Sequence, residues 1–193
     1  MATTDTGFQR VKNFAGRTSG ILDSRLIENS GTITVGDMIR GSYDAGAANG
    51  MLELAAAGNA ILGVVVGIVD SQGIDLDTSR QSLSTGAWTS STKTFVAGSN
   101  NTTVDMVKAL IDIDPLSVWS AQPDAAIGTT TSSGSSDQLG SYTDLVAASD
   151  QPDENNAGNA YNTVAQLAIL GVNPENTDRG LYVIKEHQLF GGA

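Results

Sequence analysis

The sequence feature that most constrains the fold is a nearly continuous apolar run, AILGVVVGIVD, at residues 60–70. It is rich in β-branched residues, and the longer apolar window around it is too short and too polar at its centre for a membrane-spanning helix. Such a run is typical of a strand buried on both faces, at the centre of a sandwich or barrel. Gly63 and Gly67 lie four residues apart, and the valines between them favour a strand with bends or bulges. We expect this core strand to bury Ile61, Leu62, Val64, Val65, Val66 and Ile68.

Shorter strand patterns flank this run. Residues 31–41 (GTITVGDMIRG) alternate apolar and polar side chains and turn at Gly36-Asp37, and further patterns occupy residues 51–57, 92–98, 163–172 and 181–190. Residues 102–114 fit one face of a helix or one face of a strand, and the β pattern that follows them favours the strand. The residues between 149 and 159 are expected to form an acidic loop.

Composition supports the same fold class. The chain has 22 glycines, and only 16% of its residues are charged, whereas long amphipathic helices use many Glu, Lys and Arg residues. We therefore predict an all-β protein, a small β-barrel or sandwich with an irregular N-terminal arm. Residues 1–30 form the arm in this interpretation. Residues 31–193 form the β body, with room for a second small β lobe at about 115–193.

The arm differs from the body in charge. Residues 1–40 hold five basic and four acidic side chains, whereas the remaining residues hold five basic and 17 acidic ones. The segment is either a frayed terminus, which is common, or an arm that becomes ordered on the surface of a partner. The second interpretation predicts a binding segment made of Phe8, Arg10, Val11, Lys12, Phe14 and Arg17.

Several function classes find no support in the sequence. The net charge of −11 argues against nucleic acid and anionic membranes as partners. Cysteine is absent, His187 is the single histidine, and no phosphate-binding glycine loop or nucleophile turn occurs. The first 20 residues contain no apolar core of a secretory signal. We expect no catalysis, no cofactor and no metal; a loose calcium site at Asp150, Asp153 and Glu154 is less favoured than a solvated loop.

The aspartate pairs and the two tryptophans each have a functional and a structural interpretation. The carboxylate pairs Asp75/Asp77 and Asp112/Asp114 have a spacing that puts both acids on one face of a strand, but solvated turn or edge positions are favoured over acid–base work. Trp88 and Trp119 could mark a carbohydrate-binding module, although core or rim positions are favoured for them.

The segments GTITVGDMIR and AAAGNAILGVVVGIVD resemble the small β-barrel head decoration (cement) proteins of tailed bacteriophages. The C-terminal half, including ILGVNPENTDRGLYVIKEHQLF, is similar to small virion proteins of such phages. The resemblance implies a structural protein of the capsid surface, made in the host cytoplasm, with the major capsid protein as its partner. It further implies contacts between copies, a trimer on the particle, and no contact with nucleic acid or membrane. Alternatives are a tail or head–tail connector protein, or the carbohydrate-binding module.

Overall fold

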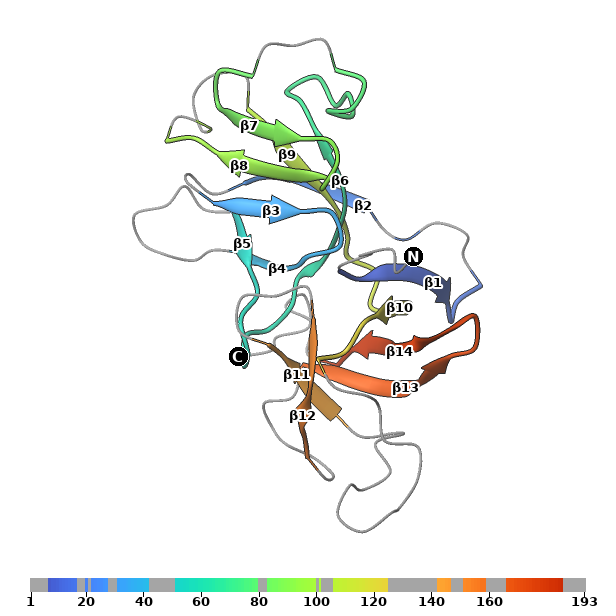
Figure 1. The fold of residues 1–193 in the computed structure, drawn as a ribbon. Helices are drawn as coiled ribbons and strands as arrows, with labels where there is room; N and C mark the ends of the chain where they lie inside the picture. Colours follow the sequence, from blue (N-terminus) through green and yellow to red (C-terminus); the bar gives the residue numbers. More distant parts are fainter. Residues whose placement is uncertain are drawn as a thin grey trace. The chain divides into compact units, whose positions relative to one another are not determined.

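Figure 1 shows a computed structural model of the chain, which describes residues 7–16, 20, 22–27, 31–41, 51–79, 83–99, 101, 106–124, 142–146, 151–158 and 166–185. These residues form 14 strands in three antiparallel sheets and contain no helix. The prediction of an all-β protein is confirmed. The chain divides into two compact units, of which unit 1 comprises Met1–Gly20, Ala55–Ile61 and Asp114–Ala193, and unit 2 comprises Ile21–Leu54 and Leu62–Ile113.

Unit 1 is built on one six-stranded sheet. In spatial order its strands are β1 (Gln9–Asn13), β10 (Ser117–Ala121), β14 (Asn176–Ile184), β13 (Leu167–Asn173), β11 (Tyr142–Leu145) and β12 (Pro152–Gly158). Buried aromatic side chains anchor its first strands: Trp119 is 1% exposed, and the Phe8 ring meets Tyr182 edge to face at 6.2 Å. Strand β12 occupies part of the range in which the sequence predicts an acidic loop, so that loop prediction is wrong for residues 152–158.

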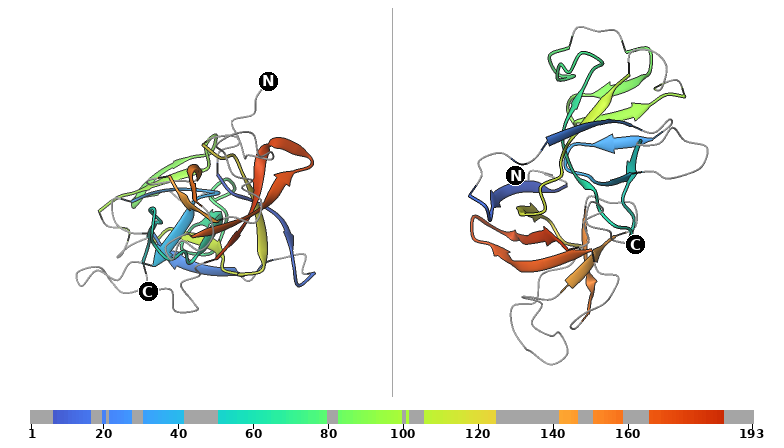
Figure 2. Two further views of the ribbon diagram at one scale, coloured as in Figure 1. Left: turned by 90° about the horizontal axis from the view of Figure 1, so that it is seen from below. Right: turned by 180° about the vertical axis from the view of Figure 1, so that it is seen from behind.

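Unit 2 consists of two sheets. The larger has the order β2 (Leu22–Leu26), β9 (Lys108–Asp112), β6 (Gly63–Val69), β4 (Met38–Gly41) and β5 (Leu52–Leu54), and the smaller has the order β3 (Thr32–Thr34), β8 (Thr94–Ala97) and β7 (Gly86–Thr89). Ile33 and Phe95 of the small sheet share one buried cluster with Ile39, Val65 and Ile111 of the large sheet. The two sheets therefore pack as the layers of a sandwich. Figure 2 (right) shows the strands of both sheets from behind.

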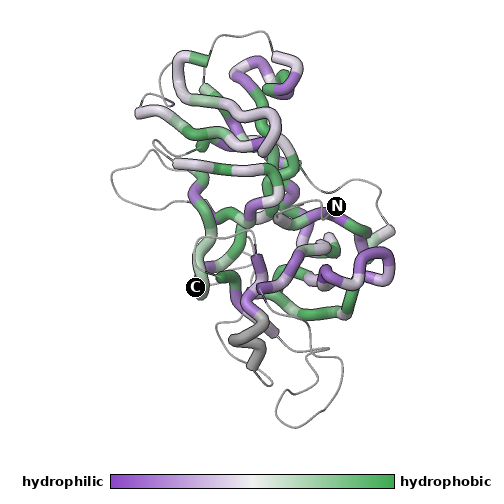
Figure 3. The backbone as a smooth tube through the Cα atoms, in the orientation of Figure 1, coloured by the Kyte–Doolittle hydropathy of each residue, from purple (hydrophilic) through white to green (hydrophobic). Residues whose placement is uncertain are grey.

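The described sheets do not close into a barrel, which was the other form of the prediction. The outer strands β2 and β5 approach each other through one isolated bridge, between Ile27 and Leu52, without a ladder. Figure 3 shows apolar residues along the central strands, and hydrophilic ones in the loop after β6 and in the turn between β13 and β14. This distribution is what half-buried antiparallel sheets require.

Strand β6 is the central run of the sequence. Ile61, Leu62, Val64, Val65 and Ile68 are all buried. Val66 is 37% exposed, so its expected place in the core is wrong. The reason is a bulge in the pairing with β9, where the register shifts between Val65 and Gly67 and turns Val66 outward.

The expected irregular arm is also wrong, because residues 1–30 contain two regular strands. Strand β1 pairs with β10 in unit 1, and β2 pairs with β9 in unit 2. The unit boundary falls at Gly20/Ile21 and not at residue 30, and the chain returns to unit 1 at Ala55–Ile61. A contiguous β body over 31–193 is therefore replaced by two interleaved units, and unit 1 takes in the range expected for a second lobe.

Candidate interaction surface

Strand β1 lies at one edge of the unit 1 sheet and exposes apolar side chains there. Val11 is 47% exposed, and Phe14, just after the strand, is 59% exposed. Leu116, in the turn before β10, is 45% exposed, and its carbonyl oxygen accepts a hydrogen bond from the Phe14 N–H at 3.0 Å. The Lys12 ammonium lies 5.7 Å from the centre of the Phe14 ring. We call Val11, Lys12, Phe14 and Leu116 the β1 surface.

Hydrogen bonds of the buried residues Asn13 and Asp114 hold the two turns of this surface together. The side-chain amide of Asn13 donates to the Asp114 carboxylate at 2.8 Å, and its carbonyl oxygen accepts from the Ala15 N–H at 2.8 Å. The second oxygen of Asp114 accepts from the Leu116 N–H at 3.0 Å. One Asn–Asp pair therefore organises the turn after β1 and the turn before β10, and this places Phe14 beside Leu116.

The structure divides the predicted binding segment. Val11, Lys12 and Phe14 are exposed and belong to the β1 surface, and Arg10 is half-buried. Phe8 is 3% exposed against Tyr182, so it belongs to the core and is wrong as a binding residue. Arg17 lies outside the described residues.

Sequence reasoning missed Leu116, which reaches the surface through long-range strand pairing. Nothing next to Pro115 in the sequence distinguishes this leucine from a core residue. Its partner strand β1 is more than a hundred residues earlier in the chain, and the register Asn13↔Ser117 brings the two together. An apolar patch with a lysine over an aromatic ring is suited to binding another protein, because burying it gains hydrophobic free energy while the ammonium stays available for an acidic group.

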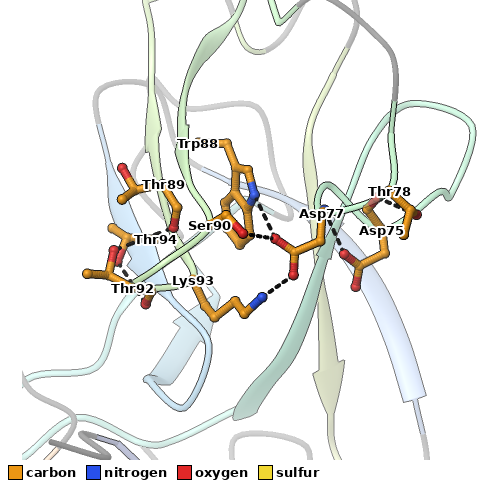
Figure 4. Close-up of polar contacts among 9 residues, drawn as sticks. All are labelled: Asp75, Asp77, Thr78, Trp88, Thr89, Ser90, Thr92, Lys93 and Thr94. Carbon is orange, nitrogen blue, oxygen red and sulfur yellow. Dashed lines mark hydrogen bonds and ion pairs between the residues drawn. The ribbon is translucent and has the colours of Figure 1, made fainter.

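A second group of polar side chains lies on unit 2, between the loop after β6 and the β7–β8 hairpin (Figure 4). One carboxylate oxygen of Asp77 accepts from the Trp88 indole N–H at 3.2 Å and from the Ser90 hydroxyl at 2.6 Å. The other oxygen pairs with the Lys93 ammonium. Lys93 has a φ of 55°, a left-handed conformation that places it in the tight hairpin turn.

This arrangement attaches the loop to the hairpin and leaves Asp77 without a role in acid catalysis. The hydrogen bonds from Lys93 and then Ser90 hold the pKa of Asp77 below its ordinary value. The carboxyl group is therefore ionised at neutral pH and its oxygens already have donors. Asp75 accepts the Asp77 N–H at 2.8 Å, so the Asp75/Asp77 pair forms a turn and does not share a strand face. No sequence pattern identifies Ser90 and Lys93 as the partners of Asp77.

The other candidate residues are also structural. Asp112 is 1% exposed on β9, and Asp114 is the buried partner of Asn13. Trp119 is 1% exposed and provides no platform for a sugar. Trp88 packs partly against the buried cluster of unit 2, and its N–H is bonded to Asp77.

Asp153 lies on β12, whereas Asp150 and His187 lie outside the described residues. Within the part of the chain that the structure describes, no three His, Asp or Glu side chains gather as metal ligands would. No helix long and apolar enough to cross a membrane occurs among those same residues. Comparison with known proteins finds no matching family model, no matching curated protein and no matching solved structure.

Proposed function

We propose that the protein is a decoration, or cement, protein of a tailed-phage capsid, and that it attaches to the major capsid protein through the β1 surface. The observation that carries the proposal is the exposure of Phe14, Val11 and Leu116 around Lys12 on a chain with a net charge of −11. Exposed apolar side chains that gather in one place mark interaction sites more often than isolated ones do. The all-β fold and the resemblance of the sequence to such proteins support the same assignment.

In this proposal the protein has no catalytic role. It stabilises the shell because it binds the assembled lattice and not the separated subunits, so the free energy of binding adds to the stability of the assembled state. The acidic side chains keep the protein soluble and repel other acidic surfaces. Lys12 and the half-buried Arg10 give the attached face the opposite sign.

Co-sedimentation with purified heads of tailed phages, followed by electron microscopy, tests the proposal. We expect the wild-type protein to occupy regular sites on the head, and the variant Phe14→Asp to bind at least tenfold more weakly, because it places a charge in the apolar contact. Leu170→Asp is the matched control, since Leu170 is 41% exposed on β13 in the same unit and lies outside the β1 surface.

The outcomes separate the alternatives. Density at the tail or at the head–tail connector would replace the decoration role with one of those virion roles. Equal binding of the wild-type protein and Phe14→Asp would remove the β1 surface from the proposal. Binding to no phage particle, together with retention on a polysaccharide column, would favour the carbohydrate-binding module.

A further inference from the structure

Lys12 is the charged side chain of the β1 surface, and it is exposed. Its ammonium lies 5.7 Å from the centre of the Phe14 ring, and it forms no ion pair with a carboxylate of the described residues. By contrast, Arg25, Arg40 and Lys93 are each paired with a nearby carboxylate. Although the chain has 21 acidic and only 10 basic side chains, the charge of Lys12 is therefore available to a group outside the chain.

The position of the Lys12 ammonium is prepared by the residues around it. The Phe14 N–H donates to the Leu116 carbonyl oxygen at 3.0 Å, and the residue between Lys12 and Phe14, Asn13, is anchored on the buried Asp114 carboxylate. The backbone therefore holds the Phe14 ring in place, and the attraction between ring and ammonium favours one position of the lysine. A side chain that is already positioned loses less conformational freedom when a partner binds.

The apolar side chains around Lys12 determine what kind of partner the surface can bind. Val11 is 47% exposed, Phe14 59% and Leu116 45%. A partner that covers them also removes water from the ammonium, which is unfavourable unless a counter-charge takes its place. With a carboxylate in that place, the attraction is stronger than in water because the surroundings are less polar. The surface thus fits a segment that combines apolar side chains with a carboxylate.

We propose that the β1 surface recognises a carboxylate of its partner, with an aspartate or glutamate against the Lys12 ammonium and an apolar side chain against Phe14 and Leu116. This inference rests on the proposed function, in which the partner is the major capsid protein. The net charge of −11 favours the same partner chemistry at this place. Most of the protein's surface repels an acidic group, whereas the β1 surface attracts one, so the ion pair fixes which face attaches.

Co-sedimentation with purified heads of tailed phages over a range of protein concentrations tests the proposal. Lys12→Met keeps a side chain of similar length beside Phe14 and removes the charge. We expect it to bind roughly thirtyfold more weakly or worse, because the carboxylate of the partner is then covered without a counter-charge. Lys12→Arg keeps the charge and can stack on the ring, so it should bind nearly as the wild type does.

The matched control is Lys108→Met, which also removes one positive charge. Lys108 is half-buried on β9 in unit 2, outside the β1 surface. Because the two methionine variants have the same net charge, long-range repulsion affects both equally. We expect Lys108→Met to bind as the wild type does, and the difference between the two variants to decrease as salt screens the attraction at Lys12. A loss of packing alone would not depend on salt in this way. Circular dichroism confirms that each variant is folded.

The outcomes distinguish this inference from the proposed function. A wild-type protein that binds no phage head overturns both. If Phe14→Asp weakens binding but Lys12→Met binds as Lys108→Met does at every salt concentration, the β1 surface remains the attachment site and the recognition of a carboxylate is overturned. A Lys12→Arg variant that binds as weakly as Lys12→Met overturns it as well, because charge would then not be what the partner recognises.

Discussion

The buried side chain of Gln166 provides a sharp test of how unit 1 is held together. Gln166 is 0% exposed at the start of β13. Its amide oxygen accepts the Leu145 N–H at 3.0 Å, and its amide nitrogen donates to the carbonyl oxygens of Ala56, at 2.9 Å, and of Asn59. One side chain thus connects β11 to the short segment Ala55–Ile61, by which the chain re-enters unit 1.

The variant Gln166→Leu replaces the polar amide with an apolar side chain and removes all these bonds. The Leu145 N–H is then buried without a partner, which costs about 1–3 kcal/mol. The Asn59 carbonyl is partly buried and loses about 1 kcal/mol. The Ala56 carbonyl still accepts the Asn59 N–H at 3.1 Å. The expected loss is about 2–4 kcal/mol, a large part of the roughly 5–15 kcal/mol that stabilises a typical domain.

The variant Gln166→Glu distinguishes a lost donor from a lost acceptor. Its carboxylate can still accept the Leu145 N–H, but it places a second oxygen against the carbonyl oxygens of Ala56 and Asn59. Protonation supplies the missing donor, so the folded state binds the proton more tightly than the unfolded state. We therefore expect this variant to gain stability as the pH falls from 7 toward about 4.3, the ordinary pKa of glutamate. Gln166→Leu should show no added pH dependence relative to the wild type.

Urea unfolding followed by tryptophan fluorescence measures these changes. Each unit holds one tryptophan, Trp119 in unit 1 and Trp88 in unit 2, so a Trp88→Phe background leaves Trp119 as the reporter for unit 1. Phenylalanine preserves most of the packing of Trp88 but lacks the hydrogen bond to Asp77. The free energy of unfolding of each Gln166 variant is therefore compared with that of the Trp88→Phe protein and not with that of the wild type. If Gln166→Leu unfolds within about 0.5 kcal/mol of that reference, which is the range of an ordinary surface substitution, the hydrogen-bond accounting is refuted.

Three further outcomes follow from the packing of unit 2. Gly63→Ala should destabilise the fold by about 1–3 kcal/mol in thermal or urea unfolding, because the new Cβ would clash with the backbone oxygen of Asp112 on β9. Gly67→Ala is the control and should be tolerated, because its Cβ would lie no closer than 3.8 Å to any neighbouring atom. Val65→Asp should abolish soluble, folded protein, because it leaves an unpaired charge in the core, while Val66→Asp should yield a folded protein with a nearly unchanged melting temperature. The hydroxyl of Ser79, and then backbone N–H groups, hold the pKa of Asp70 below its ordinary value. The Asp70 carboxylate therefore stabilises the fold above pH about 3.9, and this stabilisation is lost as the pH falls through the lower folded-state pKa. We expect Asp70→Asn to lose less stability than the wild type when the pH is lowered, as measured by urea unfolding at several pH values.

Strand β6 could be predicted from the sequence, because the apolar residues that bury it are consecutive in the chain. The run at 60–70 is apolar on both faces, and its glycines signalled the bulge that shifts the register at Gly67. The pattern could not identify Val66 as the outward residue, since a bulge reverses the alternation by one position. Which of three adjacent valines turns outward is decided by the pairing with β9, and that pairing is not visible within the run.

Strands β1 and β2 could not be predicted, because neither has an apolar period of its own. Only Asn13 of β1 is buried and no residue of β2 is, so the two strands are defined by their pairing with β10 and β9. Both partners lie far along the chain, so tertiary contacts override a weak local preference. The same cause explains the candidate surface: Phe14 and Lys12 were visible as an apolar and a basic residue in a short segment, but Leu116 joins them only through the folded sheet.

The interleaving of the two units decides how attachment can be tested. A truncation that removes the first 28 residues would remove β1 from the six-stranded sheet and β2 from the five-stranded sheet, and it would expose the buried ring of Tyr182 by removing Phe8. It would also remove the Gly7 carbonyl, to which the buried Arg179 donates at 2.7 Å. Loss of binding after such a truncation would therefore report on folding as much as on contact. Substitutions at Phe14 and Val11 avoid this, because both side chains point to solvent and the hydrogen bonds of Asn13 and Asp114 remain in place beneath them.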